Sequence, residues 1–387
     1  MLRPKIHLCL IYNTATANVT PALDPSFQPE EVILLHSPDK NYQANCLESV
    51  LKPVGIKVSH WHINDNRDVE HVRERVLELL VEREQDDIAL NASGGTRPMS
   101  MAAYEMFREF NKPIFYVHPE TDWVTWIHQR HLPSFNVADH IKLKAFLQAH
   151  GAGVGSMGER GGVPQNLREL TKDIIKHIDK LVKPLAALNW LAQQAQQDLS
   201  VYLSREQQQW SELNALIERF AQENLLKYNQ GRIQFSDETA RFFVNGGWLE
   251  QHTFSLLFGL RKDMPKIQDV GCSIEISRDS TGKEVKNELD VAFLHNNHLY
   301  IIECKTRRFK EISEENESIN SPAADVLYKL DTLKGILGDV HTRVMLVSYH
   351  SLSPWDKQRA HDLGIRVCEG QQLGRLREIL KSWMEDE

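Results

Sequence analysis

Apolar, strand-like runs alternate with amphipathic, helix-like stretches over the first 118 residues, and this alternation constrains the fold more than any other feature of the chain. In one helix-like stretch, Val69, Val72, Val76 and Leu79 recur at helical spacing. We predict strands at 6–12, 31–36, 56–63, 87–91 and 113–118, and helices at 39–51, 68–83 and 97–110. Such an alternation predicts a parallel sheet with helices on both faces, which is a Rossmann-like domain.

A glycine-dense segment, GAGVGSMGERGG at 151–162, separates this domain from the rest of the chain and predicts a linker. The following residues are helical and rich in Gln, and YNQGRIQF is compatible with a small hairpin and therefore with a winged-helix module. The remainder has the pattern of a second α/β domain with a mixed sheet. The expected fold class is α/β, with domains at 1–150, 151–235 and 236–387.

The chain has 45 Lys and Arg against 53 Asp and Glu, a formal net charge of -8. This acidic balance argues against a protein that coats nucleic acid with its whole surface, so a polyanion must bind at a local basic patch. The five cysteines include no CxxC pair, which excludes a disulfide framework and a thiolate zinc site. The first apolar run is too short for a signal sequence or a membrane-spanning helix. We therefore expect a cytoplasmic protein with no membrane partner.

The segment NELDVAFLHNNHLYIIECKT carries the strongest chemical signal. Asn296 and Asn297 tolerate positive φ and suit the central positions of a tight hairpin turn. With this turn, His295 faces His298, and the pairing of the other residues in the two strands is fixed.

This register places Asp290 opposite Glu303 and Glu288 opposite Lys305, and the two-residue period of a strand puts these four side chains on one face. The residues between them are expected to point the other way, into the core: Leu289, Val291, Ile302 and Cys304.

Two carboxylates directly opposite each other on a sheet repel unless a positive charge neutralises them. A divalent cation beside Lys305 would do so, and oxygen ligands favour Mg²⁺ or Mn²⁺ over Zn²⁺. Such a cation could lower the pKa of a bound water and offset charge on a phosphate, while Lys305 orients or activates the water. The alternative is a solvated strand face, on which Glu288 and Asp290 form ion pairs with Lys305.

A second polar motif, NASGGTRPMS, follows the fourth expected strand and opens the next helix. Gly94 and Gly95 permit close approach of the backbone to a ligand. The hydroxyl groups of Ser93 and Thr96 and the helix N-terminus favour an anion, and Arg97 adds a fork for phosphate. The polar loops NTATANVTP and HSPDKN would converge at the same end of the sheet, as a nucleotide pocket requires. An ordinary strand–turn–helix with a Ser/Thr cap is the alternative.

The order of Asp290, then Glu303 and Lys305 on the next strand, closely resembles the PD-(D/E)xK nucleases and implies a restriction-endonuclease-like C-terminal domain. In that superfamily a glutamate on a preceding helix often completes the metal site, and GGWLEQHTF supplies Glu250. The resemblance implies that Glu250, Asp290 and Glu303 hold Mn²⁺ or Mg²⁺ and that Lys305 acts on the water. An ordinary helix-surface role for Glu250 stays open.

The same helical stretch contains Gly246 and Gly247. Within a helix, each costs about 1 kcal/mol relative to Ala. We therefore expect another part of the backbone to approach the helix closely at these positions.

The loop N-x-S-G-G-T-R after a strand, with a polar loop after strand one, resembles the CARF (CRISPR-associated Rossmann fold) domain. The segment NVADHIKLKAFLQAHG also resembles the end of such domains. The family implies a homodimer that binds a cyclic oligoadenylate, expected to be cyclic tetra-adenylate, across its two-fold axis. The residues implied as ligand contacts are Thr14, Asn18, Ser93, Gly94, Gly95, Thr96 and Arg97.

The order of CARF domain, linker, GGWLE, ELD and ECK matches the cyclic-oligoadenylate-activated nucleases of type III CRISPR systems over nearly the whole chain. This implies an antiviral endonuclease that cleaves single-stranded DNA, RNA or both, with nicking of duplex DNA left open. Ligand binding would move the nuclease domains through the Gly-rich linker. The rival hypothesis is a nucleotide-responsive DNA-binding regulator that uses a winged helix around 205–235 and has a catalytically silent C-terminal domain.

Two weaker candidates remain. His60 and His62 alternate on a strand and could hold a metal, although no carboxylate or third histidine is near them in sequence. Basic and aromatic residues after the last motif could contact a nucleic-acid backbone or simply be solvated: Arg307, Arg308, Lys310, Tyr328, Lys329 and Lys334.

Overall fold

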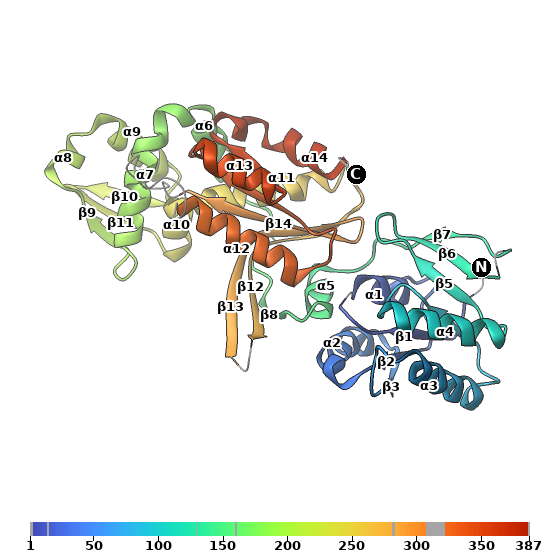
Figure 1. The fold of residues 1–387 in the computed structure, drawn as a ribbon. Helices are drawn as coiled ribbons and strands as arrows, with labels where there is room; N and C mark the ends of the chain where they lie inside the picture. Colours follow the sequence, from blue (N-terminus) through green and yellow to red (C-terminus); the bar gives the residue numbers. More distant parts are fainter. Residues whose placement is uncertain are drawn as a thin grey trace.

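The computed structural model describes residues 3–13, 15–129, 131–158, 161–280, 283–306 and 322–385. Within these residues the strands form three sheets of seven, three and six strands. Figure 1 shows the C-terminal domain (238–385) between the N-terminal domain (3–136) and a middle module (165–235).

The sheet of the N-terminal domain has the order β3-β2-β1-β4-β5-β6-β7, in which β1 to β5 are parallel and the last two strands are antiparallel. The apolar runs of β1, β2 and β4 are buried throughout because helices cover both faces of the sheet. The Rossmann-like fold is thereby confirmed. The strands are β1 (Ile6–Leu10), β2 (Glu31–His36), β3 (Lys57–His62), β4 (Ile88–Asn91), β5 (Ile114–Val117), β6 (Trp123–His128) and β7 (Phe135–Asn136), and the helices are α1 (Thr16–Leu23), α2 (Asn41–Leu51), α3 (Val69–Glu82) and α4 (Arg97–Glu109).

Two helices of this region differ from expectation. The polar loop expected after β1 continues into α1, which contains Pro21. The sequence also predicts a helix over 138–150, but this helix begins only at Leu143, as α5 (Leu143–Ala149). Its first N–H group donates a hydrogen bond to the carboxylate of Asp269 at 3.0 Å. Since Asp269 belongs to the C-terminal domain, α5 begins at the boundary between the two domains.

The middle module has the strand and helix order of a winged helix. Its elements are α6 (Gln165–Lys176), α7 (Ile178–Gln194), β9 (Ser200–Tyr202), α8 (Arg205–Gln208), α9 (Ser211–Gln222), β10 (Leu226–Asn229) and β11 (Arg232–Phe235). The buried face of α9 carries Leu216 and Phe220, as its spacing predicts. Its exposed face carries Glu212 and Glu218, whose negative charge opposes DNA phosphates and disfavours the rival hypothesis.

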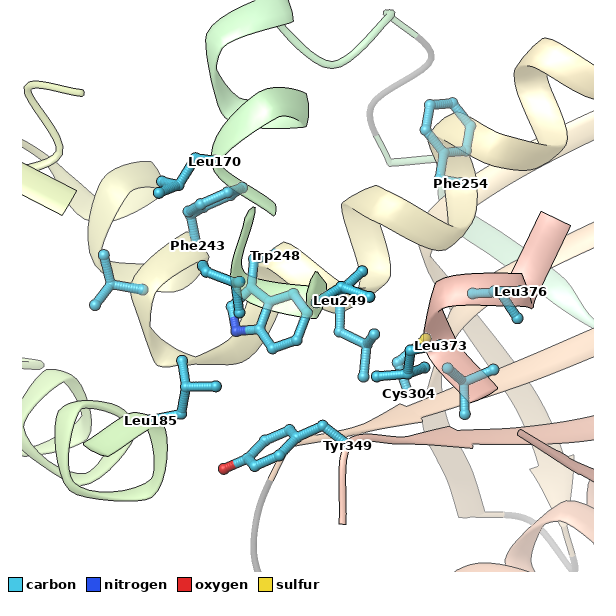
Figure 2. Packing of buried hydrophobic residues seen from close by; sticks show 14 of the residues in the cluster. Leu170, Leu185, Phe243, Trp248, Leu249, Phe254, Cys304, Tyr349, Leu373 and Leu376 are labelled. Atoms are coloured by element: carbon cyan, nitrogen blue, oxygen red, sulfur yellow. The ribbon is translucent and has the colours of Figure 1, made fainter. Parts of the chain in front are cut away.

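The sheet of the C-terminal domain is mixed, in the order β16-β15-β14-β13-β12-β8, with β14, β15 and β16 parallel. Its elements are α10 (Glu238–Phe242), a π-helical stretch (Phe243–Gly247), α11 (Trp248–Leu260), β12 (Ile267–Ser280), β13 (Lys283–His295), β14 (His298–Lys305), α12 (Pro322–Leu337), β15 (Arg343–Ser348), α13 (Pro354–Asp362), β16 (Ile365–Glu369) and α14 (Leu376–Glu385). α11 and α14 pack on one face of the sheet, and α12 and α13 pack on the other. Figure 2 shows part of the first layer, in which Trp248 and Leu249 of α11 lie beside Cys304 of β14 and Tyr349, the residue after β15.

The segment predicted as a Gly-rich linker is only partly a connection. Residues Gly153–Ser156 form β8, which pairs antiparallel with β12 through Ser156↔Glu275 and Gly153↔Ser277. The segment therefore contributes an edge strand to the sheet of the C-terminal domain. Backbone pairing of this kind holds the start of the segment in place, which a flexible Gly-rich tether would not do.

One apolar cluster extends from the N-terminal domain into the C-terminal domain. It contains Cys9 and Val32 of the first sheet, Phe146 of α5, and Leu294 and Ile301 of the second sheet. Since all of these residues are buried, the two domains share a core through α5. Movement of one domain relative to the other therefore requires this core to repack.

Candidate functional site

The hairpin formed by β13 and β14 has the register that the sequence predicts. Its turn residues Asn296 and Asn297 have φ of 50° and 58°. The two strands pair from the turn to Val291↔Ile302. The local signal, an Asn-Asn turn between two apolar strands, was sufficient to fix this pairing.

Asp290 and Glu303 directly follow the last pair of this ladder and are both buried, with exposed fractions of 9% and 1%. The Asp290 carboxylate accepts a hydrogen bond from the backbone N–H of Cys304 at 2.7 Å. Burial raises the pKa of Asp290, and the neighbouring charge of Glu303 raises it further. The pair is thus a buried concentration of negative charge.

The prediction that the residues between the polar positions share one core face holds for Val291, Ile302 and Cys304 and is wrong for Leu289. Val291 packs with α11, but Leu289 packs in the cluster that contains α12. On the partner strand β12, Ser273 has φ of +52° between Cys272, which pairs with Val291, and Ile274, which pairs with Leu289. The side chains of β13 therefore do not alternate regularly between the two faces of the sheet from Leu289 to Val291.

Lys305 forms an ion pair with Glu303. The Nζ atom of Lys305 lies 2.6 Å from the Oε1 atom of Glu303. Glu288, which we expected opposite Lys305, lies beyond the last pair of the β13–β14 ladder; it pairs with Glu275 on the other side, in β12, and is exposed. Burial lowers the pKa of Lys305, but the charges of Glu303 and Asp290 together outweigh burial and leave the pKa raised.

A second lysine reaches the same carboxylate. Lys329 of α12 places its Nζ 3.0 Å and 3.1 Å from the two oxygens of Glu303. The sequence indicated Lys329 only as a candidate for backbone contact with a nucleic acid. Its helical spacing gives no sign of the pairing, because the strand–helix contact joins residues that are far apart in the chain.

Glu250 lies in the first turn of α11, and one of its oxygens is buried without a hydrogen-bond partner in the described chain. Burial raises the pKa of Glu250, and the charges of Asp290 and Glu288 raise it further. A close approach does occur at Gly246, but it involves the side chain of Thr306 and not, as we expected, another part of the backbone. Gly246 has φ of +112°, and a Cβ there would lie 1.9 Å from the Oγ1 of Thr306, the residue after Lys305. The glycine thus lets α11 begin beside the end of β14.

The donor set fits a hard divalent cation. Glu250, Asp290 and Glu303 supply only oxygen ligands, and the buried, unpartnered oxygen of Glu250 is a group that a cation would satisfy. In the described residues no three His, Cys, Asp or Glu side chains are already arranged around one point as metal ligands. Both oxygens of Glu303 are instead held by the two lysines.

At the carboxyl end of the first sheet, the glycine loop lies against the loop after β1. A Cβ on Gly94 would lie 2.3 Å from the Leu10 carbonyl oxygen, and one on Gly95, whose φ is +79°, would lie 2.7 Å from the Leu10 Cβ. Asn18 donates a hydrogen bond to the same carbonyl at 3.3 Å and accepts one from Asn91 at 3.3 Å. The two predicted binding loops therefore meet.

Hydrogen bonds also connect the loops after β2, β3 and β4. Thr96 is the N-cap of α4 and donates to the carbonyl oxygen of Asn66 at 2.8 Å. Asn66 in turn donates to the hydroxyl of Ser37 at 2.8 Å. Ser93 accepts a hydrogen bond from the Val117 N–H at 2.7 Å. These side chains hold the loops in fixed positions around the glycine turn.

The remaining predicted contacts are placed as follows. Arg97 is exposed at the start of α4 and forms no ion pair with any described residue. Thr14 lies outside the described residues, as do Arg307, Arg308 and Lys310.

The histidine pair on β3 has partners that are distant in sequence. His36 Nε2 lies 2.8 Å from His60 Nδ1, and His60 Nε2 lies 3.3 Å from a carboxylate oxygen of Glu48. The rings of His36 and His62 are 4.7 Å apart. These residues form a hydrogen-bonded cluster, and it is not a metal-ligand arrangement in the described structure.

Together, the fold and the two sites define a class of protein in which a Rossmann-type binding domain shares a core with a nuclease-type mixed sheet. Residues 6–146 match the family model of the Card1 CARF domain, and residues 237–386 match that of the Card1-like endonuclease domain. The crystal structure of protein VC1899 from Vibrio cholerae has a TM-score of 0.87 and 31% identity, covering 98% of each chain. The chain belongs to the Card1-like family, in which a CARF domain is joined to an endonuclease domain, and it is a nuclease.

Two further structures are similar. Can2 from Sulfobacillus thermosulfidooxidans, solved in complex with cyclic tetra-adenylate, has a TM-score of 0.79 and 27% identity, covering 98% of this chain and 99% of its own. A type III CRISPR defence DNA nuclease activated by cyclic oligoadenylate shares the fold, with a TM-score of 0.57 and 16% identity over 92% of this chain and 47% of its own. Comparison with curated proteins gives no match. Among the described helices, none has the length and apolar character that crossing a membrane requires.

Proposed function

We propose that this chain is a metal-dependent endonuclease of type III CRISPR antiviral defence that cyclic tetra-adenylate activates. The observation that carries the proposal is the buried Glu303 beside Asp290 and Lys305, in a chain whose N-terminal domain matches the CARF family. The complex of Can2 with cyclic tetra-adenylate, a similar structure over nearly the full chain, supports the same activator here.

Glu250, Asp290 and Glu303 would hold Mn²⁺ or Mg²⁺, in the pattern of the PD-(D/E)xK nucleases. When bound, the cation would lower the pKa of a water and stabilise charge on the scissile phosphate. The carboxylates would keep the ion at the end of β14, and Asp290 would stay oriented by its hydrogen bond from the Cys304 N–H.

In the metal-free chain the neighbouring carboxylates leave the pKa of Lys305 raised. A cation bound to those carboxylates would oppose this effect. Lys305 would position or activate the attacking water.

The activator would bind at the carboxyl ends of β1, β2 and β4, where the linked loops meet. Arg97 is exposed at the N-terminus of α4, and both its guanidinium group and the helix end favour a phosphate. Gly94 and Gly95 would let the ligand reach the loop backbone, beside Asn18, Ser93 and Thr96. In a homodimer, two such sites would face each other across the two-fold axis.

The substrate would be single-stranded DNA, RNA or both, with nicking of duplex DNA as an additional activity. A cytoplasmic location fits the cysteines, all five of which are free. With a net charge of -8, the chain needs local positive charge at the cleavage site, which Lys305 and Lys329 provide.

The test compares the wild type with Lys305→Ala and Arg97→Ala. Each is incubated with labelled single-stranded DNA, RNA or duplex DNA and Mn²⁺, with and without cyclic tetra-adenylate. We expect the wild type to cleave only when Mn²⁺ and cyclic tetra-adenylate are both present. Lys305→Ala should cleave at least about 100-fold more slowly. The variant keeps the ion pair of Glu303 with Lys329, so its fold is expected to persist.

Arg97→Ala is expected to need more activator for the same rate. No cleavage by the wild type, or equal cleavage by Lys305→Ala, would contradict the nuclease mechanism. An unchanged activator requirement in Arg97→Ala would contradict the assigned ligand contact. Analytical ultracentrifugation tests the homodimer, which a purely monomeric species at assay concentration would exclude.

A further inference from the structure

Glu303 is held on both of its oxygens by lysine ammonium groups. Lys305 lies 2.6 Å from Oε1, and Lys329 lies 3.0 Å from Oε1 and 3.1 Å from Oε2. Only Lys305 comes from the same strand as Glu303. Lys329 comes from α12, a separate element that covers this face of the sheet.

A divalent cation at Glu303 would lie within a few ångströms of the Lys329 ammonium group. Two positive charges at this separation repel strongly in a buried site. The carboxylate can form the ion pair with Lys329 or bind the cation through the same oxygens, and each interaction opposes the other. Lys329 is 39% exposed, so its side chain can turn toward solvent when it leaves Glu303.

α12 also connects to the N-terminal domain. Two residues beyond its end, Asp339 accepts a hydrogen bond from the hydroxyl of Thr16 at 2.8 Å. Thr16 is the first residue of α1 and lies two positions before Asn18, a residue of the proposed ligand pocket. The inner face of α12, including Leu330 and Leu337, packs in the cluster that both domains share.

One helix therefore contacts the ligand-binding domain at its end and the catalytic carboxylate at its middle. A shift of α1 on ligand binding would act on Asp339 directly, and α12 would carry the shift to Lys329 as a rigid element. The path lies within a single chain and crosses the shared core.

We propose that Lys329 is a positioning residue that competes with the divalent cation for Glu303, and that α12, held at Asp339 by Thr16, selects between the two arrangements. This inference rests on the proposed metal-dependent function. Lys329 restrains Glu303 until α12 moves, and cation binding then completes the site.

The first experiment measures Mn²⁺ binding by the full chain without nucleic acid, by following the electron paramagnetic resonance signal of free Mn²⁺. Wild type is compared with Lys329→Met, with Glu303→Gln and with Lys334→Met, a control on the same helix that forms no ion pair in the described chain. We expect Lys329→Met to bind Mn²⁺ about tenfold more tightly, because a charged hydrogen bond no longer has to break. Lys334→Met should match the wild type.

Suppose that the wild type binds Mn²⁺ and Glu303→Gln does not. Unchanged or weaker Mn²⁺ binding by Lys329→Met would then overturn the inference about Lys329 and leave the metal-dependent function intact. It would mean that Lys329 supports the carboxylate for the cation. No Mn²⁺ binding by any variant would overturn the metal-dependent function together with the inference.

The second experiment repeats the titration with cyclic tetra-adenylate for wild type, Thr16→Val and Asp339→Ala. We expect the activator to tighten Mn²⁺ binding in the wild type and to have a smaller effect in both variants. Activator affinity, measured separately, corrects for any change in the pocket itself. An equal effect in all three proteins would overturn the role of the Thr16–Asp339 contact.

Discussion

The side-chain amide of Asn297, at the turn of the β13–β14 hairpin, donates a hydrogen bond to the carboxylate of Asp122 in the N-terminal domain at 3.0 Å. The same residue exchanges two 2.7 Å hydrogen bonds with the side chain of Gln268. The hairpin that carries Asp290 and Glu303 is therefore attached at its tip to the domain that would sense the ligand.

Replacing Asn297 by glycine tests this attachment. Glycine accepts the φ of 58° without strain, so the turn should persist while the side-chain hydrogen bonds are lost. We expect stability to fall by about 2–4 kcal/mol, since buried polar partners are left unpaired. The rate increase caused by cyclic tetra-adenylate should also fall, as measured with the cleavage assay.

Asn296→Gly is the matched control. Asn296 has a similar φ of 50°, but its side-chain oxygen has no hydrogen-bond partner in the described chain. Its denaturation midpoint should therefore change little. Equal losses in the two variants would mean that the turn conformation matters and the contact with Asp122 does not.

Asp122 predicts a specific dependence of stability on pH. Its pKa is raised to about 7, mainly by burial and also by the charge of nearby Asp139, although the hydrogen bond from Asn297 acts in the opposite direction. The folded chain thus holds this proton to higher pH than the unfolded chain does. The contribution of Asp122 to the stability of the fold is complete below about pH 4 and is lost as the pH rises through about 7.

Asp122→Asn should remove this dependence. Asparagine tolerates the φ of 56° and can still accept the hydrogen bond. We expect the variant to be more stable than the wild type at pH 8 by about 2–4 kcal/mol and nearly equal to it at pH 4. Urea denaturation at the two pH values measures the difference, and a parallel pH dependence in both proteins would refute the assignment.

Glu250→Gln should separate stability from activity. Burial and the charges of Asp290 and Glu288 raise the pKa of Glu250 to about 9, so at pH 8 this group must take up a proton on folding, which Gln does not require. We therefore expect the protein in EDTA to gain about 1–2 kcal/mol of stability at pH 8. Cleavage with Mn²⁺ should fall at least about 100-fold, because a proposed ligand is lost. Glu288→Gln, at an exposed position, serves as the control and should change both quantities less. Full cleavage activity of Glu250→Gln would show that Glu250 is not a metal ligand of the active site.

Gly246→Ala should disturb the active site through the backbone. The new Cβ would overlap the Thr306 hydroxyl, and the φ of +112° is one that alanine adopts only with strain. We expect a loss of about 3 kcal/mol or more in thermal unfolding, with reduced cleavage. Gly259→Ala lies in the following helix, α11, where nothing is within 4 Å of the added Cβ, and should stabilise by about 0.5–1 kcal/mol.

The sequence could predict structure wherever the determining signal is local. The Asn-Asn turn fixed the hairpin register and brought Asp290 beside Glu303. The helical spacing in 68–83 and the apolar runs of β1 and β2 fixed the elements of the first sheet. These features depend on residues within one or two turns of each other, whose periodicity the sequence displays directly.

What the sequence could not predict depends on contacts between distant segments. Lys329 reaches Glu303 only because α12 packs on β14, and no periodicity in either element encodes that distance. Leu289 packs on the other face beside a positive φ at Ser273, a residue on another strand. The helix α1 forms in a stretch whose polar residues and Pro21 favoured a loop, and its burial against the first sheet outweighs that preference.

The pairing of β8 with β12 also means that the two domains are interleaved along the chain. The polypeptide adds an edge strand to the nuclease fold before it builds the middle module, and the remainder of that fold follows only after residue 236. A nuclease fragment that begins at α6 would lack this strand and would expose the hydrogen-bonding groups of β12 to other chains. Cutting the protein between its recognisable domains would thus create an aggregation-prone edge, and the natural unit of folding is the whole chain.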